Sequence, residues 1–376
     1  MKTLGLYIHL PFCKSKCLYC DFCSFPHPRL EVMEKYTARI CEELAIWSER
    51  ARDYTVDTVY FGGGTPTVMG GDRLSRMLET VTRHYTVARD AEITVECNPR
   101  TGNFAEFKTL RRAGFNRVSV GLQSTHPNEL KRLGRGHSFD DFCATYDSLC
   151  CAGFENISVD VMSGIPEQTV ESYMQTLARV CDLSPQHISA YGLIVEEGTP
   201  FAILESRGQL ILPDEEEARQ MYMDGAAYLE NRGFGQYEIS NFAKAGYESR
   251  HNVKYWNCEE YIGFGVAAYS DFCGARFGKS RDLDAYIKGE SIECERDAIS
   301  EAERQNEYVM LRMRLCEGIS QTAFAKRFGA AAFMPFEKKL ATYESSGLVC
   351  RRGDGLAFTR EGMYVSNAIL SDVLDF

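Results

Sequence analysis

The run CKSKCLYCDFC at residues 13–23 places four cysteines directly after an apolar, β-rich stretch near the start of the chain. Thiolates this close together in a reduced compartment hold a metal, and soft thiolate ligands suit zinc or an iron–sulfur cluster. A structural zinc site usually gathers two Cys-x2-Cys pairs, or one pair and two histidines, separated by a dozen or more residues. No second pair follows downstream, so the spacing disfavours zinc.

Three of these cysteines, Cys13, Cys17 and Cys20, have the spacing Cys-x3-Cys-x2-Cys. This spacing matches the radical S-adenosylmethionine motif, in which three thiolates bind three irons of a [4Fe–4S] cluster and the fourth iron stays open for the cofactor. We predict that Cys23 is not a ligand. The run also resembles part of the ferredoxin pattern Cys-x2-Cys-x2-Cys-x3-Cys-Pro, so electron transfer by a four-cysteine cluster is an alternative, although no such cysteine–proline pair follows.

Composition limits the classes of protein that the chain can represent. Its 376 residues allow about two domains, and its formal net charge of −11 disfavours a nucleic-acid surface. The N-terminus has no apolar signal core, and no uninterrupted apolar stretch reaches the roughly 20 residues that a membrane helix needs. Fifteen cysteines are an odd number for a disulfide-stapled secreted chain. We therefore expect a cytoplasmic protein with reduced thiols.

In the first half of the chain, β-rich runs alternate with helical patterns. The β-rich runs are 4–10, 58–61, 92–97, 117–122, 157–162 and 187–193, and the helical patterns are 31–52, 73–84, 104–113, 139–152 and 171–181. Near-continuous apolar strands separated by helices imply a parallel sheet covered by helices. The suspected motifs follow the strands, where the active sites of barrels are built. We predict an α/β fold, an incomplete (β/α)6 barrel, over residues 1–200.

After about residue 200 the alternation fades and a C-terminal α+β region begins. Residues 201–298 contain linker, an acidic helix at 214–232 and a strand-rich segment around 236–256 and 261–277. Residues 299–376 predict helix, helix-turn-helix and wing, with helices at 319–327 and 333–346. A hairpin around Gly353-Asp354-Gly355, a strong turn signal, completes this winged-helix-like segment.

The run Gly62-Gly63-Gly64-Thr65-Pro66-Thr67 directly follows the second β-rich run. Glycines let the backbone approach a ligand closely because no Cβ intervenes. The run is neither a phosphate-binding loop of the Gly-x4-Gly-Lys type nor a dinucleotide fingerprint. Alone it is as well explained by a tight turn, but beside the cysteine loop it is the expected site for the amino group of S-adenosylmethionine.

Three polar residues, Glu96, Gln123 and Asp160, lie in or at the ends of apolar β-rich runs. A carboxylate in such a run is costly unless it is paired or bound to a ligand, and a structural ion pair is the plain alternative. We predict that Glu96 accepts hydrogen bonds from ribose hydroxyls. Arg135 is a candidate for the methionine carboxylate, with Asp160 holding its guanidinium or another cofactor group, although Arg135 taken alone is better explained as an ordinary exposed arginine.

These motifs, together with the run from Tyr7 to Cys13, resemble oxygen-independent coproporphyrinogen III oxidase and its relative, the radical S-adenosylmethionine heme chaperone, over nearly the whole chain. The resemblance implies a [4Fe–4S] cluster on the three cysteines and contacts to S-adenosylmethionine from a set of further residues. This set is Tyr7, Tyr19, Gly63, Gly64, Thr65, Glu96, Gln123, Arg135, Asp160 and, on the adenine side, Ile194.

Two features favour the chaperone branch of this family. The oxidase carries an N-terminal extension before its barrel, whereas here the first β-rich run starts within a few residues of Met1. The chaperone branch carries a His-Asn-x-x-Tyr-Trp motif, matched by residues 251–256. His251, Tyr255 and Trp256 form a candidate heme-facing patch, because imidazole ligates iron and rings stack on a flat macrocycle. A structural histidine in a strand is the alternative, and Tyr269 replaces a histidine that relatives often carry.

The resemblance implies a heme chaperone that transfers heme to target proteins and that cleaves S-adenosylmethionine without oxidising a porphyrinogen. The alternative is the oxidase, which converts coproporphyrinogen III propionates to vinyl groups. A DNA reader with the cluster as sensor is disfavoured, because the tail mixes Lys338 and Lys339 with acidic neighbours. As partners we expect heme, an electron donor and a heme-accepting protein, no nucleic acid, and peripheral membrane association as a further option.

Overall fold

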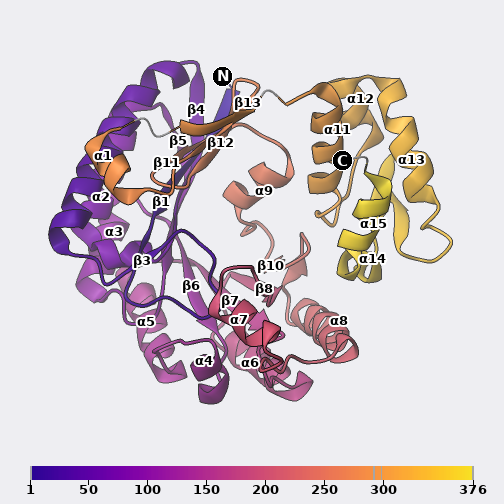
Figure 1. The fold of residues 1–376 in the computed structure, drawn as a ribbon, viewed down its shortest axis with the longest axis horizontal. Coiled ribbons are helices and arrows are strands. Elements are labelled where there is room, and N and C mark those ends of the chain that lie inside the picture. The colour runs from indigo at the N-terminus through magenta and orange to yellow at the C-terminus, as the bar shows by residue number, and fades with distance from the viewer. Residues whose placement is uncertain (1, 291–292, 298, 375–376) are drawn as a thin grey trace.

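Six parallel strands form the wall of an open barrel, as the alternating pattern predicted (Figure 1). The structure is a computed structural model and describes residues 2–290, 293–297 and 299–374. The barrel strands lie side by side in chain order: β1 (Lys2–Leu10), β4 (Tyr54–Gly63), β5 (Val87–Cys97), β6 (Arg117–Gln123), β7 (Asn156–Ser163) and β8 (His187–Gly192). This arrangement confirms the predicted incomplete (β/α)6 barrel.

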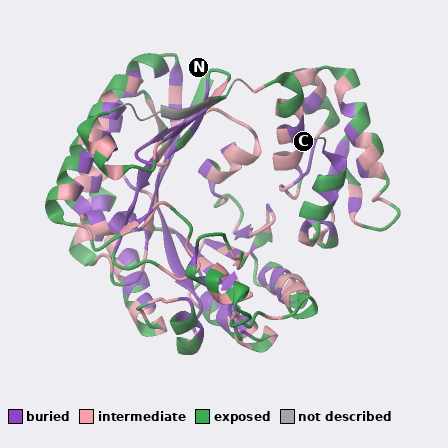
Figure 2. Cartoon of the chain, in the orientation of Figure 1, coloured by how far each residue is buried: buried purple, intermediate pink, exposed green. Residues whose placement is uncertain are grey.

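Helices cover the outer face of this wall, and the strands between them are buried (Figure 2). The covering helices are α1 (Leu30–Ser48), which continues into the 3-10 turn η1 (Glu49–Ala51), α2 (Gly71–His84), α3 (Phe104–Ala113), α5 (Phe139–Ala152) and α6 (Val170–Asp182). Their ends follow local rules: Asn103 caps α3, Ser138 caps α5, and Gly114 and Gly153 end the same helices in the left-handed conformation. The short helix α4 (Pro127–Arg132) was not predicted.

Strands from residues 201–298 extend the same sheet at both edges. β11 (Tyr261–Phe264) pairs in parallel with β1, and β12 (Tyr269–Phe272), β13 (Ala275–Lys279) and β14 (Glu293–Asp297) follow it. At the other edge β10 (Asn241–Ala243) pairs with β8 and with β9 (Gly235–Gln236). The sheet therefore has twelve strands among the described residues. A boundary near residue 200 stays a prediction, and hydrogen-bonded strands on both sides of it share one sheet.

The helices of this middle region agree only partly with expectation. The acidic helix is α8 (Glu215–Asn231), and it is accompanied by α7 (Pro200–Ser206) and α10 (Leu283–Lys288). The strand-rich reading is wrong for residues 250–256, which form the helix α9 (Arg250–Trp256). Its first amides, Arg250 N and His251 N, donate to the Glu92 carboxylate at 3.0 and 3.1 Å. A negative charge here satisfies free amides and favours the positive end of the helix dipole.

The tail forms the helices and hairpin expected of a winged-helix-like segment, around an apolar core of its own. The elements are α11 (Glu301–Arg312), α12 (Gln321–Phe328), η3 (Ala330–Phe333), α13 (Met334–Ala341), β15 (Val349–Arg352), β16 (Gly355–Phe358), α14 (Arg360–Tyr364) and α15 (Ser366–Val373). The tail lies beside α8 and α9 (Figure 1). Among the described helices, none combines the length and apolarity needed to cross a membrane.

Candidate cluster and cofactor site

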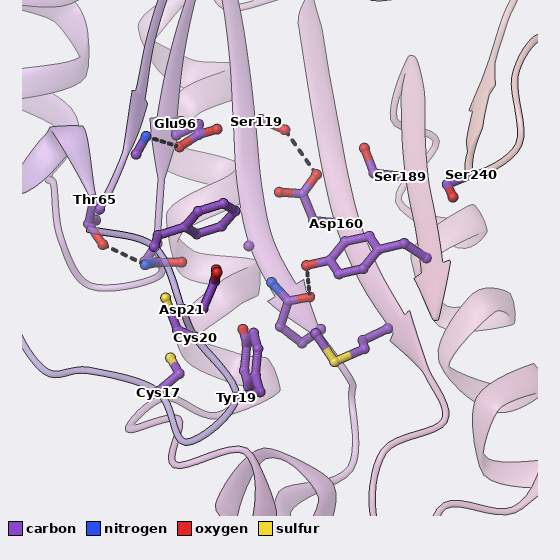
Figure 3. Close-up of a pocket in the computed structure, with 18 of the residues that line it drawn as sticks. Cys17, Tyr19, Cys20, Asp21, Thr65, Glu96, Ser119, Asp160, Ser189 and Ser240 are labelled. Atoms are coloured by element: carbon purple, nitrogen blue, oxygen red, sulfur yellow. Dashed lines mark hydrogen bonds between the residues drawn. The ribbon is translucent and has the colours of Figure 1, made fainter. Parts of the chain in front are cut away.

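A cavity of about 540 Å³ lies on the inner side of the barrel wall, between the cysteine loop, the barrel strands, α9 and the tail. Figure 3 shows the cysteines on one side and a row of polar side chains from β5 to β8 on the other. Most of the residues predicted from the sequence line this cavity: Cys13, Cys17, Tyr19, Cys20, Gly63, Gly64, Thr65, Glu96, Gln123, Arg135, Asp160, Ile194 and Trp256. Tyr7, His251 and Tyr255 are not part of the lining.

The cysteine loop is held at both ends by backbone pairing. Two short strands, β2 (Phe12–Cys13) and β3 (Phe25–Pro26), pair in parallel across its base. In its middle, Leu18 N donates to Leu133 O at 3.1 Å, which ties the loop to the residue after α4. Such pairing reduces the entropy that ligand binding would otherwise remove. The cysteine loop is therefore fixed to the barrel by backbone hydrogen bonds.

The thiols of this loop fit an iron–sulfur cluster. Thr65 Oγ1 donates to Cys13 Sγ at 3.6 Å and Arg135 Nη1 donates to Cys17 Sγ at 3.7 Å. No three His, Cys, Asp or Glu side chains of the described chain converge as one metal ion requires, whereas a cluster lets each thiolate bind a separate iron. Burial raises the pKa of the Cys13 and Cys20 thiols, so metal binding has to displace their protons.

Cys23 is placed differently from the other three cysteines. Its Sγ lies 4.0 Å from Arg281 O and the residue does not line the cavity. Its carbonyl accepts a hydrogen bond from His9 Nε2 at 2.9 Å, and Tyr7 OH lies 2.9 Å from His9 Nδ1. Because Nε2 donates, Nδ1 is the acceptor for the Tyr7 hydroxyl. Tyr7 thus supports the cysteine loop from behind the cavity wall.

The glycine run packs directly against the cysteine loop. A Cβ on Gly64 would lie 2.9 Å from both the nitrogen and the oxygen of Phe12, and one on Gly63 would lie 2.5 Å from the His9 ring. Gly63 also has a φ of 111°, which side chains rarely adopt. Gly64 N donates to Leu10 O at 2.9 Å and Thr65 N to Phe12 O at 2.8 Å. Close packing of two loops therefore explains these glycines, and the same backbone lines the cavity.

Glu96 is held by donors on the neighbouring strand. Its two oxygens accept from Tyr60 OH at 2.8 Å and from Gly63 N at 3.0 Å. Burial raises the pKa of Glu96 to about 7, and the nearby Asp160 acts in the same direction. A carboxyl group that is half-buried beside the glycine run and that can be neutral or charged near pH 7 is able to accept from, or donate to, a ligand.

Arg135 and Asp160 do not form the pair that the sequence suggested. Arg135 Nη2 donates to Asn98 Oδ1 at 2.7 Å and to Gly121 O, whereas Asp160 Oδ1 accepts from Ser119 Oγ at 2.9 Å. A Cβ on Gly121 would lie 2.6 Å from Asn98 Oδ1 and 3.1 Å from Arg135 Nη2, so this glycine makes room for both groups. Each group is oriented by its own partners, and both still line the cavity.

The remaining predicted contacts lie at the side and the mouth of the cavity. Gln123 has a φ of 73° and its Oε1 accepts from Tyr191 OH at 2.9 Å. A positive φ in a non-glycine residue stores strain that is common at binding sites. Tyr19 is near Arg135, whose charge partly offsets the rise that burial causes in the Tyr19 pKa. Ile194 is 67% exposed, as a residue at the mouth would be.

The helical form of residues 250–256 separates the members of the candidate heme patch. His251 and Tyr255 are four residues apart and share one face of α9, while Asn252 and Trp256 share the adjacent face and line the cavity. His251 is buried: Nδ1 lies 2.8 Å from Thr58 Oγ1 and Nε2 2.8 Å from Tyr255 OH. Burial lowers its pKa to about 3. Both ring nitrogens of His251 therefore have hydrogen-bond partners. The histidine that was expected to face heme points toward Thr58 and Tyr255 and does not line the cavity.

Several lining residues were missed because their signal is weak in the sequence. Arg117, Ser119 and Gly121 occupy alternate positions of β6 ahead of the predicted Gln123, and inward-facing positions of a strand recur at every second residue. The sequence shows this alternation, but only Gln123, at the end of the strand, was predicted to line the site. Other missed residues come from distant segments: Ser189, Glu238, Ser240, Asn241 and Arg314. Only the tertiary structure brings these to the cavity. Tyr269, on β12, is outside the lining.

Comparisons with known proteins agree with this architecture. Residues 7–180 match the model of the radical SAM superfamily, and residues 299–365 match that of the HemN C-terminal domain. The proteins named heme chaperone HemW of Bacillus subtilis and of Escherichia coli are each 32% identical to this chain, over 98% of both chains. The solved structure of Escherichia coli coproporphyrinogen III oxidase HemN has a TM-score of 0.85 at 21% identity, covering 99% of this chain and 90% of that one, and shows the shared fold. The chain therefore belongs to the HemW family of radical SAM proteins.

Proposed function

We propose that this protein is a heme chaperone that holds a [4Fe–4S] cluster and S-adenosylmethionine in the cavity and that transfers heme to target proteins. The observation that carries the proposal is the joint placement of three cysteine thiols, the glycine run and Trp256 of the His-Asn-x-x-Tyr-Trp motif on one cavity. The relatives that match over nearly the full chain are named heme chaperones. An electron donor and a heme-accepting protein complete the proposal.

The cavity residues divide the work of binding. Cys13, Cys17 and Cys20 would hold the cluster, which when bound provides an open iron for the methionine moiety and an electron for cleavage of the cofactor. Gly63 and Gly64 offer backbone to the amino group. The full set proposed to take part in binding S-adenosylmethionine, by contact or by support, is Tyr7, Tyr19, Gly63, Gly64, Thr65, Glu96, Gln123, Arg135, Asp160 and Ile194. Tyr7 would act from behind, through His9 and the cysteine loop.

The proposal places the protein in the cytoplasm. The fourteen cysteines whose side chains the structure describes are free, as expected in a reducing compartment. Some of these thiols, such as Cys150 and Cys151, are exposed neighbours on α5. Reduced thiols are also what a cysteine-ligated cluster requires, because the thiolate is the ligand.

Replacing Glu96 with alanine is expected to weaken binding of S-adenosylmethionine on the order of tenfold to a hundredfold, because a hydrogen bond to a charged group contributes about 1.5–3 kcal/mol. The cluster should form normally, since Glu96 contacts Tyr60 and Gly63 and no cysteine. Titration of the cofactor into the reconstituted protein, followed by the electron paramagnetic resonance signal of the reduced cluster, measures the effect. Unchanged affinity would return Glu96 to a structural role. Glu106→Ala, in the capping box of α3, is the control.

For heme, the structure favours Trp256 as the residue that faces the ligand. Its ring lines the cavity, and aromatic rings stack on flat macrocycles. His251 and Tyr255 lie behind it on α9 and hydrogen-bond to each other at 2.8 Å. Ligation of iron by His251 would require its Nε2 to release the Tyr255 hydroxyl. Trp256 and the His251–Tyr255 pair are therefore proposed to contribute in different ways, by contact and by support.

We expect the purified protein to bind one heme per chain and to leave coproporphyrinogen III unchanged when the cluster, S-adenosylmethionine and reductant are present. Heme titration by Soret absorbance and product analysis by chromatography test both parts. Robust formation of protoporphyrinogen IX would favour the oxidase, the second candidate, which the fold similarity to HemN supports. His251→Ala separates the roles of α9: altered heme absorbance indicates ligation, whereas normal absorbance with a lower melting temperature indicates support.

A further inference from the structure

Arg117 is a buried cation that lines the cavity and has no partner of its own. It is 2% exposed and occupies the start of β6, two residues before Ser119. Its Nε has no hydrogen-bond partner among the described residues, and no acid of the described chain forms an ion pair with it. A buried guanidinium without hydrogen bonds is costly. Such a group at a cavity surface calls for a ligand that supplies the acceptors.

Two acids that sense the charge of Arg117 are engaged by other donors. Glu96 and Asp160 both sense its charge, but Glu96 accepts from Tyr60 OH and Gly63 N. Asp160 accepts from Ser119 Oγ, and the two residues lie side by side in Figure 3. The negative charges of Glu96 and Asp160 act on Arg117 from a distance and reduce the free-energy cost of its burial. Neither acid supplies the direct bond that a guanidinium normally makes.

Three more buried polar atoms without partners line the same cavity: Asn241 Oδ1, Trp256 Nε1 and Arg314 Nε. Arg314 lies over the Trp256 ring, with its guanidinium carbon 4.8 Å from the ring centroid. Glu238, whose carboxyl group senses the charge of Arg314, accepts from Ser240 N at 2.9 Å and from Asn241 Nδ2. Three donors without partners therefore line one cavity: Arg117 Nε on β6, Arg314 Nε in the tail and Trp256 Nε1 on α9.

We propose that this part of the cavity is a carboxylate-binding subsite in which Arg117, Arg314 and Trp256 receive an acidic group of a ligand. A guanidinium presents a planar fork that matches a carboxylate with two parallel hydrogen bonds. The Trp256 ring next to Arg314 adds a flat apolar surface. The subsite therefore fits a planar conjugated ligand with acidic side chains, and this assignment rests on the proposed binding of heme.

Two sources of carboxylate are possible in this cavity, a tetrapyrrole propionate and the methionine carboxylate of S-adenosylmethionine. Arg135 donates to Cys17 Sγ beside the cluster loop, so it is the arginine placed for a group bound next to the cluster. Arg117 and Arg314 have no cysteine among their contacts. The tetrapyrrole propionate is the source that this separation favours.

Fluorescence of Trp256 provides a direct test. The chain has two tryptophans, and Trp47 stacks on Phe277, away from the cavity, so the Trp47→Phe variant reports Trp256 alone. In this background we expect heme to quench the emission. Arg117→Gln is expected to weaken heme binding on the order of tenfold to a hundredfold, as does loss of a charged hydrogen bond. Heme dimethyl ester should bind the parent protein about as weakly as heme binds the variant.

Controls keep each outcome decisive. Arg83→Gln removes an exposed arginine on α2 and should leave heme affinity unchanged. Arg314→Gln is a second variant, located in the tail. The comparison of heme with its dimethyl ester needs no substitution in the subsite. The proposal therefore stays testable even if Arg117→Gln misfolds. Equal affinities for heme and its ester, with S-adenosylmethionine affinity also unchanged in Arg117→Gln and Arg314→Gln, would overturn the subsite. Weaker S-adenosylmethionine binding alone would assign it to the methionine carboxylate.

Failure of the proposed function gives a different result. If the parent protein binds S-adenosylmethionine but shows no quenching with heme, the chaperone proposal fails. The carboxylate subsite is then judged from the cofactor alone: a loss of S-adenosylmethionine affinity in Arg117→Gln supports it and an unchanged affinity overturns it.

Discussion

Replacing Cys13, Cys17 or Cys20 with alanine is expected to abolish the [4Fe–4S] cluster. All three thiols line one cavity, and a cluster held by three thiolates with an open iron has no spare ligand. The loop that carries them is already fixed by β2, β3 and Leu18 N, so loss of one thiol should remove a ligand without unfolding the loop. Iron content, absorbance near the charge-transfer bands and electron paramagnetic resonance after anaerobic reconstitution measure the loss.

Cys23→Ala is the matched control in the same loop. Its thiol lies outside the cavity lining, near Arg281 O, and the hydrogen bond that matters for the loop uses its backbone carbonyl, which alanine retains. We expect a normal cluster in this variant. An equal loss of the cluster from Cys23→Ala would contradict the three-cysteine site and favour four-cysteine electron transfer.

Replacing Glu43 with alanine is expected to lower the free energy of unfolding by about 3–5 kcal/mol, because it removes one partner of a buried ion pair. Glu43 on α1 is 2% exposed and Lys279 on β13 is 3% exposed, and the two form an ion pair. The carboxylate also accepts from Tyr286 OH at 2.5 Å and from Gly265 N at 3.3 Å. The Glu43 side chain therefore links α1 of the barrel to Gly265, Lys279 and Tyr286.

Glu42→Ala provides the control for this measurement. Glu42 is the neighbouring residue on α1. It forms an ion pair with Arg39, and the Glu42 side chain is 65% exposed. An exposed ion pair contributes roughly 0–1 kcal/mol, so this variant should unfold almost as the parent does. Urea unfolding followed by circular dichroism compares the two. A Glu43→Ala variant as stable as Glu42→Ala would show that β11 to β13 are held to the barrel by other contacts.

The barrel was predictable because its determinants are local. The helices at 104–113 and 139–152 were expected at the residues where they occur, since Asn103 and Ser138 cap their first turns and Gly114 and Gly153 end them. The motifs of the site were also local: the cysteine loop follows β1, and the glycine run begins in the last two residues of β4. Strand order in a right-handed βα succession then places these loops at one end of the sheet.

Other features depend on contacts between segments that are distant in the sequence. Residues 250–256 were expected in a strand-rich segment, and the Glu92 carboxylate on β5 satisfies the first amides of the helix that they form. That helical form turns His251 toward Thr58 and Trp256 toward the cavity. The His-Asn-x-x-Tyr-Trp motif, taken as sequence, could not show that His251 and Trp256 face different surroundings.

The sequence by itself predicted the barrel from its periodicity and singled out the cysteine loop by its spacing, because both are properties of neighbouring residues. The family followed from the resemblance of its motifs, and the full-length relatives confirm it. The tertiary structure alone decided that β11 joins β1, that Asp160 binds Ser119 instead of Arg135, and that Arg117 and Arg314 line one cavity. Edge pairing, buried polar pairing and the sharing of a cavity arise from close packing between remote segments, whose side chains can be satisfied by many partners until the fold selects one.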